Sequence, residues 1–176
     1  MTKPRLATMW LDGCSGCHMS LLDLDGAIIP IVRKVDIVYG PLVDAQEFPE
    51  EVDVTLLEGA ISTQEDVDKL QQIRSRTKML VSLGDCAVTG NVPGLRNVIP
   101  VNKLLQRVYV DGADAGAGIP HDGLPQLAKQ SRPAQDFVKV DFCLPGCPPQ
   151  NKVIAGFLNN LLEGRKPEAN PKIKFG

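Results

Sequence analysis

Five short apolar runs alternate with more polar segments along the chain, and each run ends at or near a glycine, a proline or an acidic residue. Apolar runs of about four to eight residues with such boundaries are typical of buried β-strands. The pattern therefore predicts strands over residues 5–11, 35–39, 52–58, 78–83 and 137–141.

The segments between these runs predict helices. Residues 20–33 are rich in Leu and Ile but contain Gly26 and Pro30, which predicts two short helices rather than one. A capping signal, Ser62 or Thr63 with Glu65 and Asp66, predicts the start of a helix that ends near Arg76. Further helices are predicted over 101–110 and 150–163.

Two segments carry no periodic pattern. Residues 111–134 contain many glycines and prolines and are predicted to form a long loop, and loops of this length are often functional or ordered by a partner. The polar tail over 165–176 is expected on the surface or on a partner. A chain of 176 residues suits one folded unit, so we expect a single domain over 1–176.

Strands that alternate with helices predict a three-layer α/β domain around a central parallel sheet. Ligands in such folds bind beyond the carboxyl ends of the strands. Cys14, Cys17, Glu58, Cys86 and Cys147 all stand at or after predicted strand ends. We therefore expect these five side chains to meet at one edge of the sheet.

The cysteine pattern narrows the chemistry. Cys14-Ser15-Gly16-Cys17 places two thiols three residues apart, which suits a soft metal centre or a redox-active disulfide. Structural zinc is commonly held by two closely spaced pairs, whereas one pair here is joined by the isolated Cys86 and Cys147. This arrangement favours an iron-sulfur cluster, with zinc and plain buried thiols as the alternatives.

Composition excludes several classes of function. A net charge of −2 gives no general electrostatic reason to bind nucleic acid or an anionic membrane. The apolar runs are too short to span a bilayer, and the first residues do not form a signal peptide. We therefore expect a cytoplasmic protein, in which an odd count of five cysteines favours metal or redox chemistry over disulfides.

Four motifs in this order carry a resemblance to a known family: Cys-Ser-Gly-Cys at 14–17, Leu-Glu-Gly-Ala-Ile at 57–61, Gly-Asp-Cys-Ala at 84–87 and Pro-Gly-Cys-Pro-Pro at 145–149. Together they resemble the small subunit of nickel-iron hydrogenases over almost the whole chain. The run Gly-Asp-Cys-Ala-Val-Thr-Gly-Asn-Val-Pro-Gly-Leu-Arg-Asn at 84–97 resembles in particular the short small subunit of soluble NAD-reducing hydrogenases.

The resemblance implies a flavodoxin-like fold that holds one 4Fe-4S cluster through Cys14, Cys17, Cys86 and Cys147. It also implies that Glu58 lies near the cluster, either beside it or as an occasional ligand. It implies no catalytic residue on this chain. Dihydrogen would be split at a nickel-iron centre in a separate large subunit. Electrons would then pass through the cluster to diaphorase subunits that carry further iron-sulfur clusters and FMN and reduce NAD.

The longer members of the family carry a C-terminal extension with further cluster ligands, and we expect no such extension in this chain. Of the remaining side chains, Cys143 is expected to be a packed thiol, His18 to hydrogen-bond the site or line a subunit contact, and His121 to be exposed or at an interface. These three cannot build a second cluster.

Several alternatives stay open at this point. The related single-cluster subunit of quinone reductases has two adjacent cysteines at its first position, unlike Cys14 and Cys17, and a zinc-stabilised scaffold without enzymatic function is the other rival. The electron acceptor is NAD, a deazaflavin or a ferredoxin. No glycine motif for phosphate follows the first strand, so flavin binding by this chain is not expected.

Overall fold

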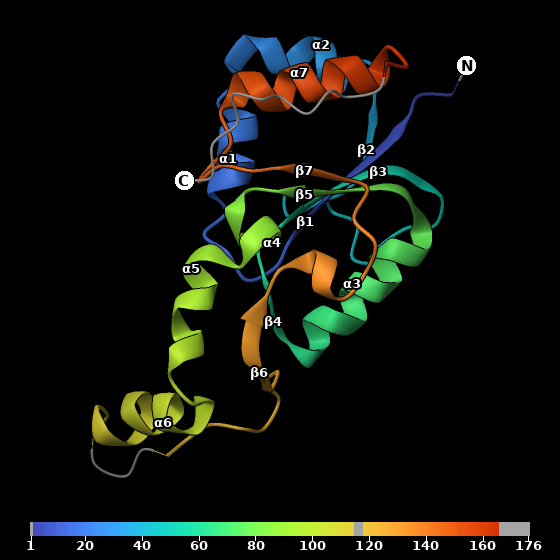
Figure 1. Ribbon diagram of the computed structural model, residues 1–176. Coiled ribbons are helices and arrows are strands. Elements are labelled where there is room, and N and C mark those ends of the chain that lie inside the picture. Colours follow the sequence, from blue (N-terminus) through green and yellow to red (C-terminus); the bar gives the residue numbers. More distant parts are fainter. Residues whose placement is uncertain (1, 115–117, 166–176) are drawn as a thin grey trace.

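A five-stranded parallel sheet forms the centre of the computed structural model, which describes residues 2–114 and 118–165 (Figure 1). The strand order is β2-β1-β3-β5-β7, and every neighbouring pair is parallel. Taken in chain order these strands run 2-1-3-4-5, which is the order of flavodoxin-like folds. The predicted α/β class is therefore confirmed. The strands are β1 (Arg5–Trp10), β2 (Asp36–Tyr39), β3 (Val52–Glu58), β5 (Thr77–Leu83) and β7 (Phe142–Leu144).

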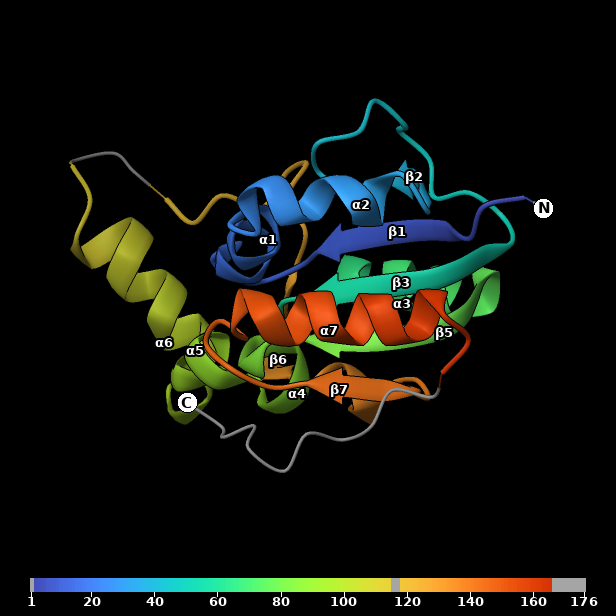
Figure 2. The ribbon, with the colours of Figure 1, turned by 90° about the horizontal axis from the view of Figure 1, so that it is seen from above.

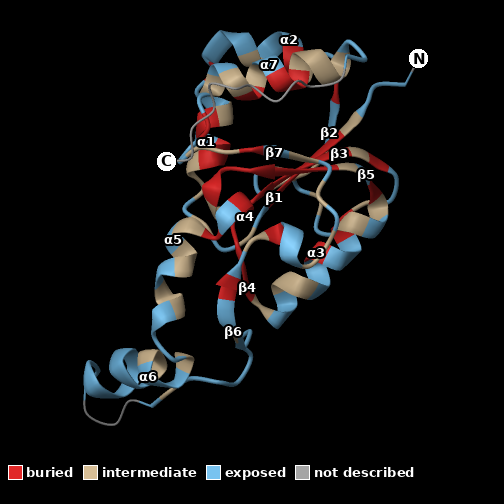
Figure 3. Cartoon of the chain, viewed as in Figure 1, coloured by how far each residue is buried: buried red, intermediate tan, exposed pale blue. Residues whose placement is uncertain are grey.

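Helices cover both faces of this sheet, and each face has its own apolar core (Figures 1 and 2). On one face Leu6 and Leu56 pack with Phe157 of α7, and on the other Leu57 packs with Leu70 of α3. Figure 3 shows the central strands β1, β3 and β5 as largely buried, whereas the edge strand β2 has no buried residue. The covering helices are α1 (Gly16–Leu22), η1 (Asp25–Ile28), α2 (Ile29–Val32) and α7 (Asn151–Leu162) on the first face and α3 (Gln64–Arg76) on the second.

The helix α3 begins where the capping signal predicted. The Thr63 hydroxyl accepts a hydrogen bond from the Asp66 amide at 3.1 Å, and the Asp66 carboxylate accepts one from the Thr63 amide at 2.9 Å. This reciprocal pair satisfies two amides that the first helical turn leaves without partners. Arg74 and Arg76 lie in the last turn, where positive charge suits the helix dipole.

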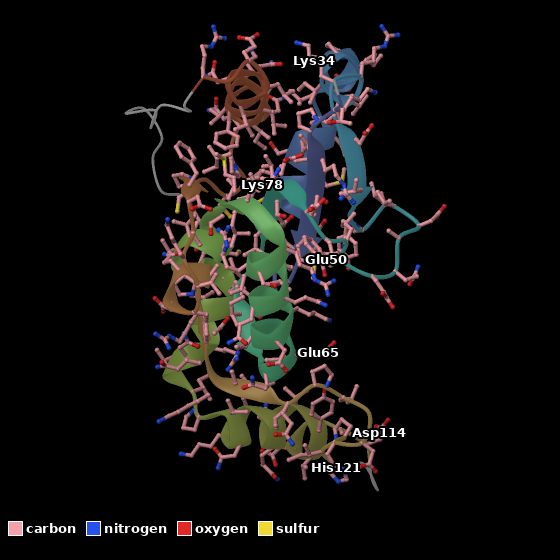
Figure 4. All side chains as sticks on the ribbon, turned by 90° about the vertical axis from the view of Figure 1, so that its right-hand side faces the viewer. Lys34, Glu50, Glu65, Lys78, Asp114 and His121 are labelled. Atoms are coloured by element: carbon pink, nitrogen blue, oxygen red, sulfur yellow. The ribbon has the colours of Figure 1, made fainter. Side chains whose placement is uncertain are left out.

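A second group of elements extends away from the central sheet (Figure 1). It contains a two-stranded antiparallel sheet and a run of short helices. In Figure 4, Asp114 and His121 lie at the far end of this extension from Lys34. The elements are β4 (Ile61–Thr63), α4 (Asp85–Thr89), α5 (Asn91–Gly94), η2 (Leu95–Val98), α6 (Val101–Gln106), η3 (Arg107–Asp111), β6 (Leu127–Arg132) and η4 (Ala134–Asp136).

Two sequence predictions are wrong in this region. Residues 137–141 do not form the last strand, which is β7 instead; Phe137 and Val138 both donate to the Ala134 carbonyl and close the η4 turn. The predicted loop over 111–134 contains β6, which pairs with β4. Only Ser131 of β6 is buried, so this strand has no apolar alternation that the sequence could reveal.

The predicted helix boundaries also need correction near the first cysteine pair. The helix α1 begins at Gly16 and therefore includes Cys17. Pro30 does not break a helix but lies in the first turn of α2, where proline is tolerated because its missing amide hydrogen has no helical partner. The predicted tail over 165–176 lies, apart from Arg165, outside the described residues. Within the part of the chain that is described, no helix combines the length and the apolar character needed to cross a membrane.

Candidate metal centre

The predicted site residues lie at the carboxyl ends of the strands, as the sequence indicated. Cys14 and Cys17 follow β1, Glu58 is the last residue of β3, Cys86 lies in the first turn of α4 directly after β5, and Cys147 follows β7. These four strands are parallel, so their carboxyl ends share one edge of the sheet (Figure 2). The fold thus gathers at one place residues that are widely separated in the sequence.

The four thiols lie close enough to influence one another. Burial raises the pKa of the Cys17 thiol above its usual range, and the charges of Glu58, Cys86, Cys14 and Cys147 raise it further. Burial also raises the pKa of Cys86, and Cys147, Cys14 and Glu58 add to that rise. Nearby negative charges raise a thiol pKa because they make the loss of its proton, which creates another negative charge, less favourable. A positively charged metal centre would remove this penalty, since metal binding releases the thiol protons.

Glycine at position 84 makes this approach possible. Gly84 has a φ of 83°, which favours glycine, and a Cβ at this position would overlap the sulfur of Cys17. The same Cβ would lie 3.4 Å from the carbonyl oxygen of Gly146. The turn between β5 and α4 therefore touches both the first cysteine pair and the loop that carries Cys147.

By its chemistry, a set of four thiols suits either zinc or an iron-sulfur cluster. Among residues 2–114 and 118–165, no three His, Cys, Asp or Glu side chains lie close enough to hold one metal ion. Four sulfurs around one zinc would be about 3.8 Å apart, because each Zn–S bond is about 2.3 Å. A cubane cluster carries its irons at separate corners, so its ligand sulfurs stand farther apart. Of the four cysteines, Cys17 is buried, Cys86 is half-buried, and Cys14 and Cys147 are exposed.

Two buried polar side chains join the cysteine-bearing loops, and the sequence did not single them out. The Asp85 carboxylate accepts a hydrogen bond from the Gly146 amide at 2.7 Å, and the Asp85 amide donates to the Gly146 carbonyl at 2.9 Å. The Ser20 hydroxyl donates to the Pro149 carbonyl at 2.6 Å. Asp85 directly precedes Cys86 in the third motif, which is a weak signal. Nothing in the sequence marks Ser20.

Glu58 and His18 form a buried pair beside the thiols. Glu58 is 1% exposed, so it is not a solvated loop carboxylate. One of its oxygens, Oε2, accepts a hydrogen bond from the His18 amide at 3.1 Å and also a short one from the His18 ring nitrogen Nδ1. The interpretation of His18 as a residue that hydrogen-bonds the site agrees with this geometry.

The two remaining side chains differ in their outcome. Cys143 was expected to be packed, but it is exposed. Side chains alternate between the two faces of the short strand β7. Leu144 is buried on one face, and on that face the ring of Phe142 packs against the ring of Phe157 with 4.9 Å between the ring centroids. Cys143 therefore points to the opposite face. The side chain of His121 is 81% exposed, as expected, and lies far out on the extension in Figure 4.

Comparisons with known proteins identify the family of this chain. The family model described as "NADH ubiquinone oxidoreductase, 20 Kd subunit" matches residues 14–161, which include all five predicted site residues. The chain is 36% identical over 168 residues to the NAD-reducing hydrogenase HoxS subunit delta of Cupriavidus necator, covering 93% of this chain and 80% of that protein. The chain belongs to the family of nickel-iron hydrogenase small subunits.

Other relatives of this hydrogenase family extend the comparison. A crystal structure of an NAD+-reducing [NiFe]-hydrogenase in the H2-reduced state matches with a TM-score of 0.93 and 37% identity, and the match covers 98% of each chain. A subunit of the F420-non-reducing hydrogenase of Methanocaldococcus jannaschii is 39% identical over 171 residues, covering 96% of this chain. The chain spans only 59% of the length of that relative.

Proposed function

We propose that this chain is the electron-relay subunit of a hydrogenase and holds one 4Fe-4S cluster through Cys14, Cys17, Cys86 and Cys147. The observation that carries the proposal is the convergence of these four thiols, from three different strand ends, on one another and on Glu58. When bound, a 4Fe-4S cluster accepts and releases single electrons. The chain itself supplies the ligands, the buried carboxylate and the hydrogen bonds that fix the loops, and we assign it no catalytic residue.

A single cluster agrees with the position of the remaining candidate ligands. Cys143 lies on the exposed side of an edge strand, and His121 lies on the extension. His18 is already bonded to Glu58. With these side chains dispersed, residues 1–176 are proposed to act as one domain with one redox site.

The proposed partners follow from the relatives. The names of the HoxS subunit delta and of the matched structure both describe NAD-reducing hydrogenases. By analogy, this chain takes electrons from a nickel-iron centre in a large subunit and passes them to diaphorase subunits that carry iron-sulfur clusters and FMN and reduce NAD. The alternatives are a deazaflavin acceptor, since one relative is named coenzyme F420 hydrogenase subunit gamma, and a ferredoxin, since others are named F420-non-reducing hydrogenases. The complex is proposed to work in the cytoplasm.

Paired cysteine variants test the relay in the anaerobically purified complex. In Cys86→Ala the cluster should be lost, and hydrogen-dependent NAD+ reduction should fall at least about 100-fold, as for the loss of an essential group. Exchange of deuterium between gas and water at the large subunit should persist, because it requires no exit of electrons. Cys143→Ala, on the exposed side of β7, should retain both activities and the cluster spectrum.

The outcome that contradicts the proposal is full NAD+ reduction by Cys86→Ala, or loss of the cluster in Cys143→Ala alone. Replacing NAD+ by a deazaflavin or a ferredoxin in the same assay identifies the acceptor. A wild-type complex that reduces quinone with NADH and does not oxidise hydrogen would support the related quinone reductase subunit, whose name the family model carries.

A further inference from the structure

The carboxylate of Glu58 stands between two groups at the edge of the central sheet. Its oxygen Oε2 faces His18, as described above, whereas Oε1 lies 3.6 Å from the position that a Cβ on Gly13 would take. Gly13 directly precedes Cys14. The second oxygen of Glu58 is therefore directed toward the loop that carries the first cysteine pair.

This carboxylate is near enough to the thiols to matter for ligation. Glu58 is among the groups whose negative charge raises the pKa of Cys17 and Cys86, and its side chain is almost fully buried. Carboxylate oxygens, like thiolates, bind iron in many protein sites. A buried carboxylate that is free to turn could therefore replace a cysteine on a bound cluster.

His18 restrains this carboxylate with two donors from one residue. A carboxylate oxygen only accepts hydrogen bonds, so His18 donates from both its amide and its Nδ1 to Oε2. The other ring nitrogen, Nε2, is buried and has no hydrogen-bond partner among the described residues. The ring of His18 is thus held through Glu58 and is not shared with a competing polar group on the described part of the chain.

We propose that His18 is a positioning residue that holds Glu58 by Oε2, so that this carboxylate remains beside the four-cysteine cluster as a fixed charge and does not become a ligand. The inference rests on the proposed function, because it requires a cluster at Cys14, Cys17, Cys86 and Cys147. It assigns the histidine that follows the first motif to the site without making it a ligand.

Four variants of the purified complex test this assignment: His18→Ala, His18→Asn, Glu58→Gln and the double variant His18→Ala/Glu58→Gln. The readouts are the electron paramagnetic resonance spectrum of the reduced cluster and its midpoint potential. In His18→Ala the released carboxylate should change the spectrum. At the wild-type midpoint potential, the ratio of reduced to oxidised cluster in His18→Ala should also be about tenfold lower than in the wild type. A change of this size is expected from the loss of one hydrogen bond to a charged group.

The other variants separate positioning from a general loss of structure. The side-chain amide of His18→Asn can donate from the place of Nδ1, so its spectrum should remain that of the wild type. The double variant has no carboxylate to release, so it should match Glu58→Gln alone, and the effect of His18→Ala should vanish in that background.

Two results overturn the inference. The first is a wild-type spectrum and midpoint potential in His18→Ala. The second is an equal effect of His18→Ala in the wild type and in the Glu58→Gln background, which would mean that His18 does not act through Glu58. Iron and sulfide analysis of the wild type separates this failure from that of the proposed function. About four of each per chain with an unaffected His18→Ala rejects only the positioning role, whereas a wild type without iron and sulfide rejects both.

Discussion

Asp85 shows how one side chain can hold two ligand loops in register. It is 2% exposed and binds Gly146 in both directions, through its carboxylate at 2.7 Å and its amide at 2.9 Å. Because Asp85 precedes Cys86 and Gly146 precedes Cys147, these bonds fix the distance between two proposed cluster ligands. Such support from residues next to the ligands contributes strongly to the properties of metal sites.

Removal of this carboxylate should destabilise the chain. In Asp85→Ala the partly buried Gly146 amide loses its acceptor, and the free energy of unfolding should fall by about 1 kcal/mol, the low end of the cost for an unsatisfied buried donor. Equilibrium denaturation measures this change. Asp122→Ala is the matched control, since its side chain is fully exposed and its loss should change stability by less than about 0.5 kcal/mol. An equal free energy of unfolding for Asp85→Ala and the wild type would show that this hydrogen bond does not stabilise the fold.

At the scale of single residues, the sequence predicted which side chains gather at one edge of the sheet, but few of their contacts. The four cysteines could be predicted because soft-metal ligands have few other uses in this pattern, and Glu58 because it ends a buried strand. The hydrogen bonds of Ser20 and Asp85 could not, since each joins segments that meet only in the folded chain. For His18 the sequence predicted a hydrogen bond to the site as one of two roles, but not Glu58 as the partner.

Among the elements, an ion pair between Arg74 and Asp141 ties the end of α3 to the residues directly before β7. The Asp141 carboxylate accepts from the Leu80 amide at 2.9 Å and from the Arg74 guanidinium at 2.5 Å. Burial works to raise the pKa of Asp141, but these two donors outweigh it and leave the pKa below its usual value. The bonds join the end of α3 to β5 and to the segment that leads into β7.

A depressed carboxyl pKa gives a defined dependence of stability on pH. The unfolded chain binds the proton more tightly, so Asp141 contributes stability above the unfolded pKa of about 4 and loses it as pH falls through the folded pKa. Asp141→Asn should therefore lower the free energy of unfolding by about 1 kcal/mol at pH 7, a modest value because the pair is partly solvated.

Urea denaturation at pH 7 and near pH 3 measures this difference. The gap between Asp141→Asn and wild type should shrink at the lower pH, while the exposed Asp44→Asn should show no gap at either. A gap of constant size across both conditions would mean that the charge of Asp141 does not stabilise the fold.

The elements also show which sequence signals are reliable. The helix α3 and the strands β1, β3 and β5 could be predicted because their apolar residues face a core or their ends carry caps. The strand β6 could not, since its stability comes from pairing with β4 and from Asn97, whose side chain bonds both the amide and the carbonyl of Ser131 at 2.8 Å. The position of β7 was missed for a similar reason: it is a three-residue edge strand.

On the scale of the whole molecule, parallel strand direction explains the site. Five parallel strands bring all their carboxyl ends to one edge, and two apolar cores hold the sheet rigidly between its helices. A rigid cage suits electron transfer, because the ligands of a redox centre should move little when its charge changes. The alternation of strands and helices predicted this arrangement before any contact was known.

The central claim is that the gathered thiols hold one 4Fe-4S cluster. Iron, acid-labile sulfide and zinc should be quantified in the anaerobically purified protein, and the dithionite-reduced sample examined by electron paramagnetic resonance. About four irons and four sulfides per chain with the signal of a reduced cubane is the expected result. Zinc without sulfide, and no signal on reduction, would contradict it and leave a metal-stabilised scaffold in place of an electron relay.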